Sequence, residues 1–257
     1  MTNKIQITLI QIDNYGPWTM ELGNDREYRL QMLQSSLYSD LQKHISNRNG
    51  IVFYNRFDEI LAITNGIGLP EHASIQEEIL SKYPFTISMS VGRGNTPYEA
   101  QHMASVVLQH AGSAQSNKRK SLLLGTPQDF PGDRVQMVHI DVDYATQKYV
   151  DVISAFETTM MMRKISVALG EQFLKKKALT FYFGGDNFAA VANGVRADSI
   201  EKILENTGRG LHLSLKGGVG IAMRARKAME LATANLDKIR EERTNGPTRK
   251  LMKSTER

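Results

Sequence analysis

The stretch GIVFYNRFDEI (residues 50–60) recurs as ALTFYFGGDNF (residues 178–188), 128 positions later, with an aspartate at the same place in each. At the same offset Asp13 falls on Asp141, and matching Asn-Gly and Val-Gly pairs follow. Apolar coincidences arise by chance, but repeated aspartates and turn pairs at one spacing do not arise easily. The chain is therefore predicted to be a tandem duplication of one domain, aligned without a gap.

Each half shows the same order of predicted elements. Ile5 to Ile12 is rich in β-branched residues and predicts a strand, whereas Leu30, Leu33, Leu37 and Leu41 recur at helical spacing. The full order, β-α-β-β-α-β-α, is that of a ferredoxin-like core with an added helix. We expect an α+β protein with two tandem ferredoxin-like domains, each a mainly antiparallel sheet with helices on one face.

The expected domains cover residues 1–120 and 135–243. Between them, glycines and prolines of residues 113–134 indicate a connection. Residues 244–257 lack periodicity and carry several basic side chains, so they are expected to form a disordered tail.

The composition excludes several classes of site. The 257 residues include no cysteine, which rules out disulfides, thiolate zinc sites and cysteine nucleophiles and favours a cytoplasmic location. The net charge of +5 favours an anionic ligand. No apolar run is long enough to span a membrane. The strands carry no aromatic strip of the kind that binds RNA, so no nucleic-acid partner is expected.

Four aspartates form the candidate metal set. Asp13 and Asp141 end the first strand of each half, and Asp58 and Asp186 lie in the hairpin turns. In this topology the first strand lies beside a hairpin strand, so the carboxylates of each half can approach. Their repulsion is relieved by a shared proton or a cation, and oxygen ligands suit Mg²⁺ or Mn²⁺. The alternative is that each aspartate only forms a turn or caps a helix.

Three segments of the second half resemble the palm-type catalytic domains of diguanylate cyclases and class III nucleotide cyclases: Ile140–Asp143, Gly184–Asn187 and Val219–Ala222. In those families the first-strand acid and the hairpin acid hold two metal ions on a nucleoside triphosphate. The resemblance implies those roles for Asp141 and Asp186, and a palm-type version of the expected fold.

A more specific resemblance covers nearly the whole chain except its last residues. The segments that carry it resemble archaeal GTP cyclohydrolase III and are Gln11–Trp18, Thr96–Gln101, Gly112–Gln115 and Gly184–Phe188. This resemblance implies opening of the guanine imidazole ring of GTP at C8, giving 2-amino-5-formylamino-6-(5-phosphoribosylamino)pyrimidin-4(3H)-one and two inorganic phosphates. It places the reaction in flavin and deazaflavin synthesis, with Mg²⁺ as cofactor and a monovalent cation as a further candidate. A homo-oligomer is expected. Zinc held partly by cysteine, as in other GTP cyclohydrolases, is excluded here.

Further residues are candidates for catalysis and GTP binding. His139 shares a strand face with Asp141 and is a candidate general base, with a structural histidine as the alternative. Gly184 and Gly185 allow backbone to approach a ligand closely. Asn14, Asn187 and the ring of Tyr15 could contact the guanine, although each residue type is also common in turns or cores. Trp18 is a candidate for base stacking or for the core. Basic residues near helix ends could contact phosphate or be solvated: Arg119, Lys120, Lys238 and Arg240.

Two other functions remain open from the sequence. A palm-type nucleotide cyclase would use the same metal site but would release pyrophosphate and leave the guanine ring intact. A non-catalytic nucleotide- or RNA-binding protein would use the basic surface, and its affinity for nucleic acid would fall steeply with salt.

Overall fold

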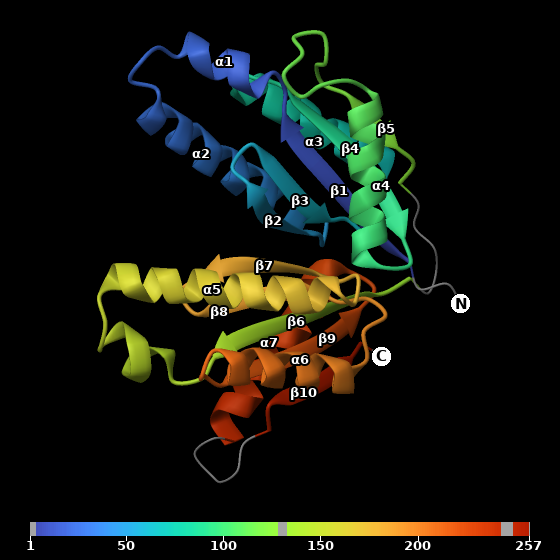
Figure 1. Ribbon diagram of the computed structural model, residues 1–257. Helices are drawn as coiled ribbons and strands as arrows, with labels where there is room; N and C mark the ends of the chain where they lie inside the picture. Colours follow the sequence, from blue (N-terminus) through green and yellow to red (C-terminus); the bar gives the residue numbers. More distant parts are fainter. Residues whose placement is uncertain (1–3, 128–132, 243–248, 257) are drawn as a thin grey trace. The chain divides into compact units, whose positions relative to one another are not determined.

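The computed structural model describes residues 4–127, 133–242 and 249–256. The chain forms two compact units: unit 1 contains residues 1–95 and 99–133, and unit 2 contains residues 96–98 and 134–257. Each unit is built on one five-stranded sheet (Figure 1).

The sheet of unit 1 has the order β2-β3-β1-β4-β5, with β1 at its centre. All neighbouring strands are antiparallel except β4 and β5. The strands are β1 (Ile5–Ile12), β2 (Ile51–Arg56), β3 (Glu59–Ile63), β4 (Ile87–Gly94) and β5 (Leu123–Gly125). The helices are α1 (Tyr15–Glu21), α2 (Glu27–Ser46), α3 (Leu69–Lys82) and α4 (Pro97–His110).

The sheet of unit 2 repeats this plan with the order β10-β9-β6-β8-β7, in which only β9 and β10 are parallel. Its strands are β6 (Val135–Val142), β7 (Leu179–Gly184), β8 (Asn187–Val191), β9 (Leu215–Ala222) and β10 (Leu251–Thr255). A short π-helix η1 (Thr146–Val150) precedes α5 (Ala155–Leu174), α6 (Ala197–Gly210) and α7 (Ala225–Glu242). The predicted α+β class and mainly antiparallel tandem sheets are confirmed. Within the described ranges, no helix is long and apolar enough to cross a membrane.

One face of each sheet carries the main core. In unit 2, Val138, Ile140 and Val142 alternate along β6 and pack with Leu169 and Phe173 of α5. In unit 1, Ile10 and Ile12 of β1 pack in the same way with leucines of α2. Every second residue of the strand and the regularly spaced leucines of the helix therefore pack in one buried layer, as the sequence pattern predicts.

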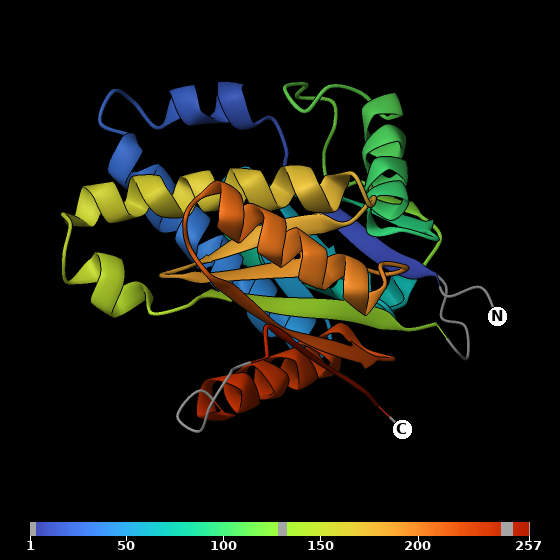
Figure 2. The same cartoon turned by 60° about the horizontal axis from the view of Figure 1, so that its bottom comes forward.

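The opposite face of each sheet is also covered by a helix. A side chain at Gly217 would meet Leu204 of α6, whereas one at Gly218 would meet the carbonyl of Ala232 in α7. Consecutive strand residues point to opposite faces, so α6 and α7 lie on opposite sides of this sheet (Figure 2). In unit 1, Gly92 meets α4 in the same way. The prediction of helices on one face is therefore wrong, because glycines carry no hydrophobic signal for the second face.

A segment expected to be disordered forms the edge strand of unit 2. β10 pairs with β9 from Leu251 opposite Gly217 to Thr255 opposite Ile221. The amide of Asn235 in α7 donates to Oγ of Ser254 at 2.8 Å. The prediction of a disordered tail over residues 244–257 is thus wrong for β10, because its order comes from the neighbouring strand. Residues 243–248 and 257 lie outside the described residues. In unit 1, β5 of the predicted connection takes the equivalent edge.

Hydrogen bonds show that the first strand of unit 2 is shifted by two residues from the position that the 128-residue offset predicts. The amide of Gln6 donates to Oδ1 of Asn65 in unit 1, and the amide of Gln136 donates to Oδ1 of Asn193 in unit 2. The asparagines are 128 positions apart, but the glutamines are 130 apart.

Sheet pairing gives the same result, since Gln11 lies opposite Glu59 and Asp141 lies opposite Asn187. Gln11 is therefore the counterpart of Asp141, and Asp13 is the counterpart of Asp143. The gapless match of Asp13 with Asp141 is wrong. A shift of two leaves every side chain on its original face, so the hydrophobic pattern does not reveal it.

We expect Gly218→Ala to destabilise the protein by about 2 kcal/mol or more, because the added methyl would lie 1.9 Å from the carbonyl oxygen of Ala232. Gly210→Ala is the control: its Cβ meets nothing within 4 Å, and alanine favours a helix by roughly 0.5–1 kcal/mol. Chemical denaturation measures both. Equal stability of the two variants would contradict the close packing of α7 on β9.

Candidate functional site

Asp141 and Asp186 come together in unit 2 at the end of β6. The pairing of β6 with β8 sets Asp141 opposite Asn187, and the amide of Val142 donates to the carbonyl of Asp186. Asp141 is buried, with 6% of its surface exposed. Burial, opposed by Arg240 and reinforced by the charge of Asp186, raises the pKa of Asp141 to about 6. The two carboxyl groups thus form a pair that a proton or a cation stabilises.

The two oxygens of Asp141 have different surroundings. Oδ2 accepts hydrogen bonds from Nε and Nη2 of Arg240 at 3.2 and 3.0 Å. Oδ1 is buried and accepts no N–H or O–H donor among the described residues. The carboxyl group of Asp186 contacts that of Asp141, and a hydrogen bond between the two requires a proton on one of them. A buried acceptor without a donor is costly, so Oδ1 marks a place for a proton or a cation.

A series of hydrogen bonds through Asn187, His139 and Thr233 supports the side chain of Asp186. Nδ2 of Asn187 donates to Oδ1 of Asp186 at 2.8 Å, so the amide oxygen of Asn187 is the acceptor for Nε2–H of His139 at 3.0 Å. Nδ1 of the neutral ring then accepts from the hydroxyl of Thr233 in α7 at 3.0 Å. Residues of β6, β8 and α7 therefore position the side chain of Asp186 together through these hydrogen bonds.

These contacts bear on two of the predicted site residues. Burial lowers the pKa of His139, which favours the neutral ring that the hydrogen bonds require. Both of its ring nitrogens are engaged within the protein, as is the amide of Asn187. The geometry favours the structural alternative for His139 and a supporting role for Asn187.

The double glycine is needed for the shape of the hairpin turn between β7 and β8. Gly184 has φ 100° and Gly185 has φ 61°, a region that side chains disfavour. A Cβ at Gly184 would meet nothing within 4 Å, so the backbone there is open to a ligand. The hydroxyl of Tyr182 donates to the carbonyl of Gly185 at 2.9 Å and holds the turn.

The carboxylate of Asp13 in unit 1 accepts three hydrogen bonds from within the protein. Hydroxyls of Thr86 and Ser88 donate to it at 2.6 Å each, and the amide of Ser121 donates at 2.8 Å. Nε of Arg119 lies 3.5 Å from its Oδ1. Three of about four acceptor sites of this carboxylate are therefore used within the protein, and a buried guanidinium already supplies the neighbouring positive charge. The side chain of Asp58 instead pairs with Arg56, so the predicted metal pair of Asp13 with Asp58 is not formed.

A guanidinium occupies the place in unit 1 that corresponds to the pair in unit 2. Nη2 of Arg119 donates to Oε1 of Gln11 at 3.0 Å, and Gln11 donates in turn to Glu59. The side chain of Arg119 is 3% exposed. In unit 2, Asp143 forms an ion pair with Lys216 at 3.1 Å. Sequence reasoning missed these pairings because their partners come from different elements.

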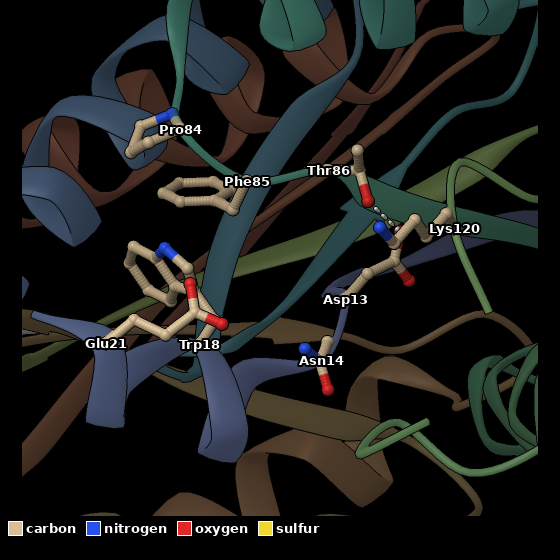
Figure 3. A pocket seen from close by; sticks show the side chains of 8 residues that line it. All are labelled: Asp13, Asn14, Trp18, Glu21, Pro84, Phe85, Thr86 and Lys120. Atoms are coloured by element: carbon tan, nitrogen blue, oxygen red, sulfur yellow. Dashed lines mark hydrogen bonds between the residues drawn. The ribbon is translucent and has the colours of Figure 1, made fainter. Parts of the chain in front are cut away.

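A cavity of about 170 Å³ lies beside Asp13 in unit 1 (Figure 3). Trp18 lines it but packs edge-on against Phe85 in the core, which agrees with the core alternative for this ring. The hydroxyl of Tyr15 accepts a hydrogen bond from Gln34. Asn14 has φ 52°, and its Oδ1 has no hydrogen-bond partner in the described part of the chain. Oδ1 of Asn14 is thus a buried acceptor without a donor. The cavity is lined by Asp13, Asn14, Trp18, Glu21, Pro84, Phe85, Thr86 and Lys120.

Fold and site together define a tandem α+β protein in which a buried carboxyl group, that of Asp141, pairs with Asp186 beside a glycine turn in its second unit. The chain belongs to the GTP cyclohydrolase III family, whose model matches residues 6–253.

Two curated relatives carry the name GTP cyclohydrolase III. The protein of Methanocaldococcus jannaschii is 45% identical over 236 residues, which cover 92% of this chain and 88% of the relative. That of Methanobrevibacter smithii is 44% identical over 240 residues, covering 92% and 94%. Among solved structures, the GGDEF domain of FimX from Pseudomonas aeruginosa matches 48% of this chain and 82% of that chain, with 11% identity and a TM-score of 0.39.

The pKa of Asp141 predicts a pH-dependent effect of Asp141→Asn on stability. Because the folded pKa is raised from 3.8 to about 6, the wild-type protein loses stability as the pH rises through that window. Asparagine does not titrate, so the variant should gain relative to wild type between pH 4 and 6 and level off above. The shift of roughly two units corresponds to about 3 kcal/mol.

Denaturation at pH 4, 5, 6 and 7.5 without divalent cations measures this difference. Asp151→Asn, at an exposed position, is the control and should show no such trend. If the stability difference between Asp141→Asn and the wild-type protein did not change with pH, the pKa of Asp141 would not be raised in the folded state.

Proposed function

We propose that this chain opens the imidazole ring of GTP and retains the formyl group, giving 2-amino-5-formylamino-6-(5-phosphoribosylamino)pyrimidin-4(3H)-one and two inorganic phosphates. Membership of the GTP cyclohydrolase III family supports the substrate and the reaction. The observation that carries the site is the buried Oδ1 of Asp141, which has no N–H or O–H donor among the described residues, in a carboxyl group that also interacts with Asp186.

The same pair fits a Mg²⁺ ion, with Mn²⁺ as a substitute. Among the described residues no group of three or more His, Cys, Asp or Glu side chains could hold a metal. Two carboxylates suit Mg²⁺ nonetheless, since it usually keeps several waters and is bound by one or two carboxylates together with substrate phosphates. Asp141 and Asp186 would hold the ion. When bound, it would neutralise triphosphate charge and lower the pKa of a coordinated water.

The other residues of unit 2 support this pair. Asn187 donates to Asp186 and keeps one carboxylate oxygen in place. The open backbone of Gly184 and Gly185 offers a surface for phosphate oxygens. In unit 1, the buried Oδ1 of Asn14 has no hydrogen-bond partner among the described residues, and a role for it in GTP binding remains a proposal. A role for Tyr15 in base stacking and a requirement for a monovalent cation remain proposals.

Asp141→Asn and Asp186→Asn should each lower kcat/KM for GTP by roughly 100-fold or more. Each substitution removes a carboxylate that would ligate Mg²⁺ chiefly when the metal and GTP are bound together. The assay follows loss of guanine absorbance and release of two phosphates per GTP. Asp151→Asn, at an exposed position, should retain full activity. Pyrophosphate release with an intact ring would identify a cyclase instead, and full activity of Asp186→Asn would remove this pair from the mechanism.

His139→Gln tests whether the histidine is a base or a positioning residue. Because both ring nitrogens are engaged, we expect the pH profile of kcat/KM to keep its shape while the Mg²⁺ concentration for half-maximal rate rises. Thr233→Ser keeps the hydroxyl that bonds Nδ1 and should behave as wild type. Loss of the acidic limb of the profile in His139→Gln would show that His139 is the general base.

A further inference from the structure

Arg240, near the C-terminal end of α7, is the cation that faces Asp141. Its Nε and Nη2 lie 3.2 and 3.0 Å from Oδ2 of Asp141, and its Nη1 donates to Oδ1 of Asp237 at 2.9 Å. The guanidinium therefore bridges a buried carboxylate of the sheet and an exposed carboxylate one turn earlier in its own helix. Its other anchor is at the surface, with the side chain of Asp237 51% exposed.

The burial of Arg240 differs from that of the guanidinium in unit 1. The side chain of Arg240 is 37% exposed, whereas that of Arg119 is 3% exposed. Arg119 is held by Asp13, by Gln11 and by the carbonyl of Gly112. A guanidinium enclosed in this way is a permanent part of unit 1, but Arg240 can leave into solvent while keeping its bond to Asp237.

The other cation on this face of unit 2 is less free to move. Lys216 is buried, and its Nζ lies 3.1 Å from Oδ1 of Asp143, which follows the last residue of β6. Arg240 is thus the exchangeable positive charge at Asp141. Oδ1 and Oδ2 belong to one carboxylate, so a divalent ion at Oδ1 would lie close to the guanidinium on Oδ2 and would repel it.

We propose that Arg240 is a built-in counterion: it neutralises Asp141 in the cation-free protein and leaves Oδ2 when a divalent cation binds. The inference rests on the metal site of the proposed function, but not on the ring-opening reaction. Its consequence is that cation binding is a competition with Arg240, so the affinity of the site for a divalent ion is set partly by a residue that does not ligate it.

The test is Mn²⁺ binding to the full chain without nucleotide, measured from the paramagnetic resonance of free Mn²⁺. Arg240→Gln removes the competitor and should bind Mn²⁺ roughly three- to tenfold more tightly, as expected for loss of a partly exposed ion pair. Arg240→Lys keeps a charge and should remain close to wild type. Lys227→Gln, which breaks an exposed ion pair earlier in α7, is the matched control and should not change the affinity.

Unchanged or weaker Mn²⁺ binding by a folded Arg240→Gln would overturn the proposal. If that variant does not fold, the proposal is tested on the wild-type protein by NMR. In a sample with ¹⁵N-labelled arginine, the Nε–H resonance absent from Arg240→Lys should move when Mg²⁺ is added, and a resonance that stays in place at saturating Mg²⁺ would overturn the role of Arg240.

The binding experiment separates this inference from the proposed reaction. A chain that binds Mn²⁺ through Asp141, with the predicted effect of Arg240→Gln, supports the counterion even if no ring opening is detected. If Asp141→Asn binds Mn²⁺ as tightly as wild type, the metal site itself is elsewhere and both the site and the counterion fail.

Discussion

The pairing of β6 with β8 is the constraint on which the candidate site depends. It sets Asp141 opposite Asn187 at the point where the hairpin turns, and so brings the buried carboxyl group of Asp141 to the half-buried one of Asp186. The positive φ angles of Gly184 and Gly185 let the chain turn there. Bringing like charges together in a buried place is unfavourable. The protein relieves this repulsion only in part, because one oxygen of Asp141 has no hydrogen-bond donor among the described residues.

The two units solve the same electrostatic problem in different ways. Unit 1 has Gln11 in the place of Asp141 and an enclosed Arg119 between Gln11 and Asp13, so its charges are balanced within the chain. Unit 2 keeps the second carboxylate and balances it with Arg240, which is partly exposed. Within the described residues, the two units thus share a scaffold, and the acidic pair of Asp141 with Asp186 lies in unit 2.

Rigidity of the pair comes from the face of the sheet that carries little hydrophobic signal. Gly218 and Gly220 allow the backbone of α7 to lie directly on β9. That close approach brings Thr233 within hydrogen-bond distance of His139, whose other nitrogen reaches Asp186 through Asn187. It also brings Arg240 to Asp141. The small residues of one strand therefore position the polar network of the neighbouring strands.

The sequence by itself determined the duplication, the α+β order and the meeting of Asp141 with Asp186, because strand and helix periods and repeated turn residues are local signals. It did not determine the two-residue shift of the first strand, since such a shift keeps every side chain on its face. Nor did it predict β10, the hydrogen bonds that Asp13 accepts, or the contact of Arg240 with Asp141. Those depend on partners distant in sequence, and only the tertiary structure decides which hydrogen bonds and charges a buried carboxylate receives.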